Sequence, residues 1–199
     1  MRRSGQWSRD KHRIRVGNTQ ESAYYSAGIP SRYWHEEWNL TPTGLSYPRL
    51  GVDQGNHPPI GTDLQKQAMD DLLKPETFNT SWRVGIGSDP NGDKAMAFAC
   101  RVAKKAVDLG KKIHFIDAGS PRWMHEVEDN EELVVIYNLS PEASTEERLM
   151  VVRDILIRVS DRLCILVVDG NPGVYFNMLK FYKNALIYFT GPTVVTKSI

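Results

Sequence analysis

The sequence predicts an α/β fold with a mainly parallel sheet that is covered by helices on both faces. Two observations support this prediction. From residue 81 onward, strand-like apolar runs alternate with amphipathic helical segments, an order that is typical of α/β domains. Several of these runs are apolar at every position, as strands buried on both faces are. Five strands are expected, at Trp82–Ile86, Ile113–Ile116, Leu133–Tyr137, Leu163–Val168 and Ala185–Phe189.

Helical segments lie between most of these strands. The longest ends at Gly110, because glycine readily takes the left-handed conformation that closes a helix. Another begins with Ser144-Thr145-Glu146-Glu147, a pattern typical of a capped N-terminus. A helix ahead of the first strand ends at Pro75. In chain order, the helices are expected at Thr62–Leu73, Lys94–Leu109, Thr145–Val159 and Tyr175–Tyr182.

The composition indicates a soluble globular protein, with 41% hydrophobic and 25% charged residues. No run approaches the length of a transmembrane helix, so no membrane association is expected. The basic N-terminus is not followed by the apolar stretch of a secretory signal. Cys100 and Cys164 lie far apart inside apolar segments, which predicts buried thiols in a reducing cytoplasm rather than a disulfide or a zinc site.

Residues 1–60 are expected to form an irregular N-terminal arm, and residues 61–199 the α/β domain. The arm holds five of the eleven prolines, and it is too aromatic for a simple linker. Trp7, Trp34 and Trp38 are interleaved with arginines, a combination that can stack on nucleic-acid bases. The favoured interpretation is that these aromatics anchor the arm to a surface groove.

The start of the arm is strongly basic. Residues 1–15 contain six cations against Asp10 alone, a net charge of +5, whereas the whole chain carries only +1. Clustered cations of this kind can neutralise nucleic-acid phosphates. A solvated, disordered tail is the equally weighted alternative. The candidate nucleic-acid contacts are Arg2, Arg3, Arg9, Lys11, Arg13 and Arg15.

The first predicted strand runs through a glycine-containing turn into the longest helix, which is the context that a phosphate-binding loop requires. Aligned on Lys94, residues 88–95 replace the pattern GxxGxGK followed by Ser or Thr without a gap, with Ser88, Asn91 and Asp93 at the glycine positions. Such a loop holds ATP or ADP through its backbone N–H groups and its lysine. The candidate nucleotide contacts are Ser88, Asn91, Gly92, Lys94 and Ala95.

The substitutions in this loop argue against efficient hydrolysis. Asn91 and Asp93 replace glycines and can keep the loop shape, because both residue types tolerate left-handed backbone angles. Asp93, however, places a negative charge where phosphate would lie. Ala95 lacks the hydroxyl that binds magnesium in working loops. A degenerated site or a plain strand-to-helix turn is therefore favoured over a retained nucleotide site.

The acidic positions support the same interpretation. Tyr137 and Asn138 end the third strand, where an ATPase would carry the aspartate and glutamate that hold magnesium and polarise water. Asp169 and Asp117 end other strands and are weak candidate metal ligands. A capping role is favoured for both. No catalytic residue is assigned, and His114 has no metal-ligand spacing, so it is expected to be structural.

Taken together, these features resemble the helicase-loader and transposition-helper branch of the AAA+ ATPases. Residues 27–33, Ala-Gly-Ile-Pro-Ser-Arg-Tyr, are similar to its GIPxRY segment, and the loop retains Pro90 and Lys94. The resemblance implies a sheet order of 5-1-4-3-2, a role in phage or mobile-element DNA replication, and a replicative helicase as partner. Two departures are notable: the chain leaves no room for the family's helical lid, and no arginine finger can be assigned.

Three functional hypotheses follow. The favoured one is a non-catalytic or weakly active accessory protein that assembles with a protein partner in the cytoplasm of a bacterial or phage-infected cell. The second is an active ATP-binding NTPase that uses Asp169 or Asp117 for magnesium. The third is a structural or interaction module that uses the fold without nucleotide, since fold alone does not fix function.

Overall fold

A computed structural model describes residues 19–38, 40–43, 62–120, 130–139, 146–191 and 195–197. A five-stranded sheet forms its centre, and every neighbouring pair of strands in it is parallel. The order across the sheet is β3-β4-β5-β2-β6. Numbered along the chain, this is 5-1-4-3-2 read from the other edge, so the predicted order is confirmed. The strands are β2 (Arg83–Ser88), β3 (Ile113–Asp117), β4 (Leu133–Leu139), β5 (Leu163–Asp169) and β6 (Asn184–Phe189).

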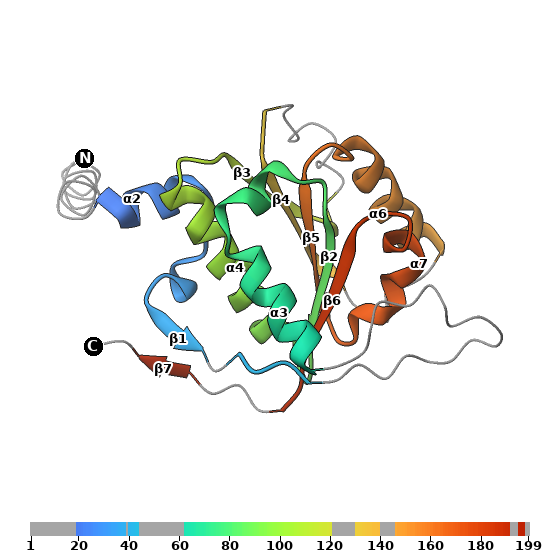
Figure 1. Ribbon diagram of the computed structural model, residues 1–199, viewed down its shortest axis with the longest axis horizontal. Coiled ribbons are helices and arrows are strands. Elements are labelled where there is room, and N and C mark those ends of the chain that lie inside the picture. The colour runs from blue at the N-terminus through green and yellow to red at the C-terminus, as the bar shows by residue number, and fades with distance from the viewer. Residues whose placement is uncertain are drawn as a thin grey trace, which may run out of the picture.

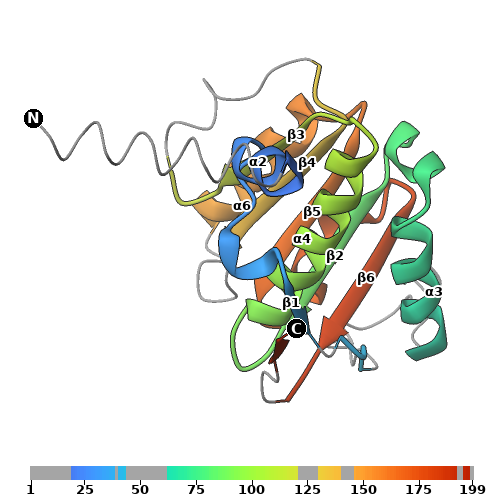
Figure 2. The same ribbon diagram turned by 90° about the vertical axis from the view of Figure 1, so that its left-hand side faces the viewer.

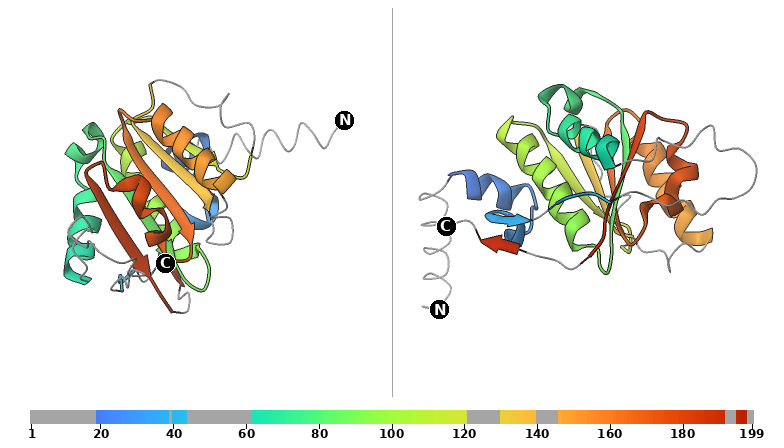
Figure 3. Two further views of the ribbon diagram at one scale, coloured as in Figure 1. Left: turned by 90° about the vertical axis from the view of Figure 1, so that its right-hand side faces the viewer. Right: turned by 60° about the horizontal axis from the view of Figure 1, so that its bottom comes forward.

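Helices cover both faces of this sheet, so the predicted three-layer architecture is also confirmed. Helices α3 (Thr62–Leu72) and α4 (Asp93–Asp108) lie on one face, and α6 (Glu146–Arg158) and α7 (Phe176–Leu179) lie on the other (Figures 1 and 3). This arrangement is compatible with a Rossmann-like fold or with a P-loop fold. Within the described part of the chain, no helix has both the length and the apolar character needed to cross a bilayer.

The two hydrophobic cores follow from the alternation of side chains along the central strands. In β5, Ile165 belongs to the core under α4, whereas Cys164 and Leu166 belong to the core under α6. All six residues from Leu163 to Val168 are buried. The uniformly apolar runs in the sequence therefore reflect strands covered on both faces, as predicted.

Three of the four helices begin and end within one or two residues of their predicted positions. The fourth, expected at Tyr175–Tyr182, is instead a 3-10 turn at Pro172–Tyr175 followed by the short α7. The side chain of Asn171 accepts a 2.8 Å bond from the Gly173 N–H and starts the turn. After α7 the chain turns directly into β6. A further 3-10 turn, at Pro75–Asn79, leads from α3 into β2.

The N-terminal segment contains more regular structure than predicted. It forms α2 (Thr19–Ser26), a 3-10 turn at Ser31–Tyr33 and β1 (Glu36–Trp38), which pairs antiparallel with β7 (Val195–Lys197) near the end of the chain. Figure 2 shows α2 and β1 alongside α4. Tyr24, Ile29, Tyr33 and Trp38 are buried in the core that α4 shares with the sheet. The prediction that aromatics anchor this segment to the main body is confirmed for Trp38.

Candidate residues before Thr19 lie outside the described residues. This group includes Trp7 and all six cations that were expected to contact nucleic acid, namely Arg2, Arg3, Arg9, Lys11, Arg13 and Arg15. Their role stays a prediction.

A fully buried arginine links the sheet to α6. Arg83, in β2, donates to the carbonyl of Arg162 at 2.7 Å and to that of Val159 at 3.1 Å, with a longer contact to the Leu156 carbonyl at 3.4 Å. These carbonyls lie at and just beyond the C-terminal end of α6, the negative end of its dipole. The guanidinium also lies 4.8 Å from the ring centre of Tyr182. The charge is thus compensated by carbonyl groups.

Candidate functional site

The candidate phosphate loop lies at the carboxyl end of β2, where the chain passes into α4. Ser88 ends the strand, Gly92 caps the helix, and α4 begins at Asp93. This edge of an open parallel sheet is where α/β proteins usually bind ligands. The fold therefore places the loop where a nucleotide site would be expected.

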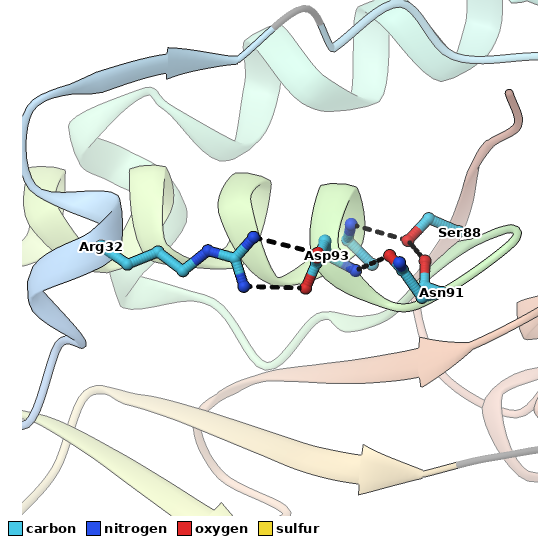
Figure 4. A network of polar contacts seen from close by, with 5 residues as sticks. Arg32, Ser88, Asn91 and Asp93 are labelled. Atoms are coloured by element: carbon cyan, nitrogen blue, oxygen red, sulfur yellow. Dashed lines mark hydrogen bonds and ion pairs between the residues drawn. The ribbon is translucent and has the colours of Figure 1, made fainter. Parts of the chain in front are cut away.

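The hydroxyl of Ser88 bridges the two sides of this loop (Figure 4). It donates to the Asn91 carbonyl at 2.6 Å and accepts from the backbone N–H of Ala95 at 3.1 Å. The side chain of Asn91 in turn accepts from the N–H of Asp93 at 3.1 Å. Two N–H groups in the first turn of α4, which would face a phosphate in a working loop, are thus already bonded to side chains of the protein.

Lys94 is directed toward another part of the protein. The residue is only 9% exposed, and its ammonium group donates to the Thr190 carbonyl at 3.1 Å. Thr190 directly follows β6, which neighbours β2 in the sheet. The structure therefore brings all five candidate nucleotide contacts together in one turn, but three of them, Ser88, Asn91 and Lys94, are engaged in internal hydrogen bonds.

Asp93, at the first turn of α4, forms an ion pair with the N-terminal segment. The guanidinium of Arg32 donates to both carboxylate oxygens, at 3.2 and 3.0 Å (Figure 4). Arg32 also lies over the rings of Tyr33 and Trp38, at 5.4 and 5.1 Å from their centres. The segment that resembles GIPxRY is thus attached to the loop, and the negative charge of Asp93 is balanced by a cation from outside the α/β domain.

The crevice between β2 and β5 is closed by the chain itself. A Cβ atom on Gly87 would lie 2.0 Å from the Gly170 carbonyl oxygen and 2.5 Å from Cδ of Pro172. The N–H of Gly170 also donates to the Ser88 carbonyl at 2.9 Å. The turn after β5 therefore packs directly on the end of β2, and only glycine fits at position 87.

Asp117 has the structural role that was favoured for it. Its Oδ1 atom accepts from the Gly119 N–H at 2.8 Å and from the side-chain amide of Asn138 at 2.9 Å. Asn138 has a φ of 64° and lies at an irregularity in the β4–β5 pairing. Tyr137, beside it, makes an edge-on contact with the ring of Phe115. These residues build a turn at the end of β3 and β4.

Asp169 differs from Asp117 because it is exposed. It ends β5 directly opposite Ser88 of β2, and a Cβ atom on Gly92 would lie 3.4 Å from its Cα atom. Asp89 is nearby in the loop and accepts a hydrogen bond from the hydroxyl of Tyr188. No group of three or more metal-binding side chains occurs among the described residues.

His114 and the two cysteines are the remaining candidate residues. Nδ1 of His114 lies 3.3 Å from the carboxylate of Glu131. Cys100 and Cys164 are both free and buried. Burial raises the pKa of each thiol to about 12, so neither is a nucleophile near neutral pH.

Two features of this site were missed in the sequence. Ser88 was predicted as a nucleotide contact, and the bridge that its hydroxyl makes within the loop was not anticipated. Arg32 was noted within a motif but was given no partner, because its partner Asp93 lies 61 residues further along the chain. A scan against protein-family models gives no match for the chain, and neither does a search of curated proteins.

Proposed function

We propose that this chain is a non-catalytic accessory protein of the P-loop type, which acts by assembling with a protein partner. The observation that carries the proposal is the bridge made by Ser88. Its hydroxyl satisfies the Ala95 N–H and the Asn91 carbonyl, so the space that a phosphate would need is crossed by the protein's own hydrogen bonds. Opening the loop for a nucleotide would break both bonds.

The absence of catalytic groups from the equivalent positions supports the same proposal. Ala95 offers no hydroxyl for magnesium, and β4 carries Tyr137 and Asn138 at the position of the acidic pair. Lys94 donates to the Thr190 carbonyl and would have to exchange this bond for a phosphate. Three parts of one chemistry are thus missing or otherwise engaged.

The setting of this function follows from the resemblance to helicase loaders. It suggests an assembly role in phage or mobile-element DNA replication, in the cytoplasm, with a replicative helicase as the partner. The basic residues before Thr19 would contact the nucleic acid in such an assembly. Co-elution of the purified chain with a purified replicative helicase of its host in size-exclusion chromatography tests the partner, and separate elution would contradict it.

Isothermal titration calorimetry of the full chain with ATP and ADP, with and without magnesium, tests the loss of the nucleotide site. We expect no binding heat at millimolar nucleotide. Magnesium-dependent binding that Lys94→Ala abolishes and Lys66→Ala preserves would refute the proposal. Lys66 is an exposed lysine on α3, outside residues 88–95, and is the matched control.

A second candidate function, a weak NTPase, is supported by one observation. Asp169 is exposed and lies at the strand end opposite Ser88, beside the backbone of Gly92. A carboxylate at this position is suitable for holding magnesium next to a bound phosphate. If this function is correct, nucleotide affinity will depend on magnesium in the wild type and will lose that dependence in Asp169→Asn.

A further inference from the structure

An aromatic and basic turn lies at the amino end of the parallel strands, whereas the phosphate loop lies at their carboxyl end. Residues 180–183, Lys-Phe-Tyr-Lys, connect α7 to the start of β6. Phe181 is 80% exposed, more than any other large apolar side chain in the described part of the protein. Nothing in the phosphate-loop region accounts for this exposure.

The turn is held in place by hydrogen bonds of its own. The side-chain amide of Asn184 donates to the carbonyl of Tyr182 at 2.8 Å and to that of Leu179 at 3.2 Å. The N–H of Tyr182 also donates to the Leu179 carbonyl, at 3.0 Å. A ligand would therefore meet a preorganised turn, and ordering the backbone on binding would cost little.

Each aromatic ring at this edge has a cation beside it. The ammonium of Lys180 lies 5.1 Å from the ring centre of Phe181, and that of Lys183 lies 4.3 Å from the ring centre of Trp82. Tyr182 lies against the buried Arg83. Trp82 adjoins the turn because the next residue, Arg83, is paired with Asn184, the first residue of β6. Two of these three rings, those of Phe181 and Trp82, thus have a lysine beside them, whereas the cation beside Tyr182 is buried.

Acidic side chains also lie near this surface. The carboxylate of Asp71 is 2.8 Å from the ammonium of Lys74, which is itself half-exposed. Lys183 is close enough for its charge to contribute to lowering the Asp71 pKa, although the hydrogen bond from Lys74 is the main cause. The pKa of Asp161 is lowered mainly by its hydrogen bond from Arg162, with a smaller contribution from Arg83. Both carboxylates are thus bonded to other cations, and Lys180 and Lys183 are the lysines that lie beside the rings of Phe181 and Trp82.

We propose that the 180–183 turn, with Trp82, is a binding site for single-stranded nucleic acid. Such a ligand presents flat bases that stack on exposed rings, and phosphates that pair with flanking lysines. A protein partner would instead favour a continuous apolar area, whereas here the exposed ring of Phe181 is bordered by lysines on both sides of the sequence. The site includes no residue of the phosphate loop or of the basic stretch 1–15, so it goes beyond the proposed function.

The test is the affinity of the full chain for a fluorescein-labelled oligothymidylate of about twenty nucleotides, measured by fluorescence anisotropy. Phe181→Ala should weaken binding roughly 5-fold to 100-fold, the range for loss of one stacked base. Tyr25→Ala, which removes another exposed aromatic side chain on α2, is the matched control and should not change the affinity. Circular dichroism of each variant establishes that the fold is retained.

The lysines give an independent readout through salt. Lys180→Gln and Lys183→Gln should each reduce the slope of log affinity against log salt by about 0.7, the value per phosphate contact on a single strand. Lys66→Gln should leave the slope unchanged. A variant in which all six N-terminal cations are changed to Gln shows whether binding depends on them or on the 180–183 turn. The six are Arg2, Arg3, Arg9, Lys11, Arg13 and Arg15.

Any of four results would overturn the proposal. The first three are no binding by the wild type, equal affinity of the wild type and Phe181→Ala, and binding that disappears with the N-terminal cations and is indifferent to Phe181. An equal loss by Phe181→Ala on a blunt duplex would also overturn it, because a duplex offers no unstacked bases. Each of these results can occur whether or not the phosphate loop binds a nucleotide. The test is therefore independent of the calorimetry on the phosphate loop.

Discussion

Replacing the buried Arg83 with methionine should destabilise the protein by about 3 kcal/mol. A net contribution of about 1.5–3 kcal/mol is usual for a hydrogen bond to a charged group. Arg83 makes two such bonds of good length, to the carbonyls of Arg162 and Val159, and a third, longer contact to Leu156. Together the two bonds thus contribute about 3–6 kcal/mol.

Two further effects decide the net value. Methionine relieves the several kcal/mol that a buried charge loses in leaving water, and it fills most of the volume of the arginine stem. It also leaves the Arg162 carbonyl without this donor, at about 1–3 kcal/mol, whereas the Val159 carbonyl still accepts from the Arg162 N–H at 3.3 Å. The two effects are similar in size and opposite in sign, so the net loss is expected near the lower end of the range, at about 3 kcal/mol.

Urea unfolding followed by circular dichroism measures this loss. Arg83→Lys should lie between the wild type and Arg83→Met, because one ammonium cannot reach all of the carbonyls that the guanidinium fork reaches. Arg153→Met, at an exposed position on α6, is the control and should change the free energy of unfolding by less than about 0.5 kcal/mol. If Arg83→Met also stays within about 0.5 kcal/mol of the wild type, the reasoning is refuted.

Three other predictions concern packing and ionisation. Gly87→Ala should destabilise the fold by about 3 kcal/mol or more, seen as a lower urea midpoint, because its Cβ would meet backbone after β5 at 2.0 Å. Burial, and then the Asp108 carboxylate that accepts from its hydroxyl, raise the pKa of Tyr24 to about 12. The resulting stability, up to about 3 kcal/mol, is complete below pH 10 and is lost as the pH rises from about 10 to about 12. Comparison with Tyr24→Phe by alkaline unfolding isolates this loss, and an identical pH profile in the variant would contradict it. Cys100 and Cys164 should react with a thiol reagent only after unfolding, and rapid labelling of either in native buffer would show that it is not buried.

The regular part of the fold was predictable because burial on both faces leaves a strong pattern in the sequence. The run Leu163–Val168 has no polar residue, and it became the central strand β5. The pairing of β1 with β7 was not predictable. Each strand has only three residues, and their partners lie at opposite ends of the chain. Local patterns carry no information about contacts of that kind.

The candidate site was predictable in position but not in its bonds. Lys94 and the surrounding turn identified the carboxyl end of β2, and the structure brings the candidate residues together there. Which groups satisfy the loop depends on side chains that approach from elsewhere, such as Arg32 on Asp93, and on the rotamer of Ser88. Arg83 was equally hidden, since an arginine near the start of a strand is normally exposed.

The pairing of β1 with β7 also sets an order of events during synthesis. Chains leave the ribosome from the N-terminus, and domains fold as their parts emerge. α2 and the 3-10 turn after it can dock on α4 as soon as that helix and its sheet are present. Strand β1 must wait for Val195–Lys197, which are made after all five strands of the central sheet. The segment that contains Arg32 is therefore fastened at its far end only after the central sheet has been made, so the surface around Asp93 matures after the sheet.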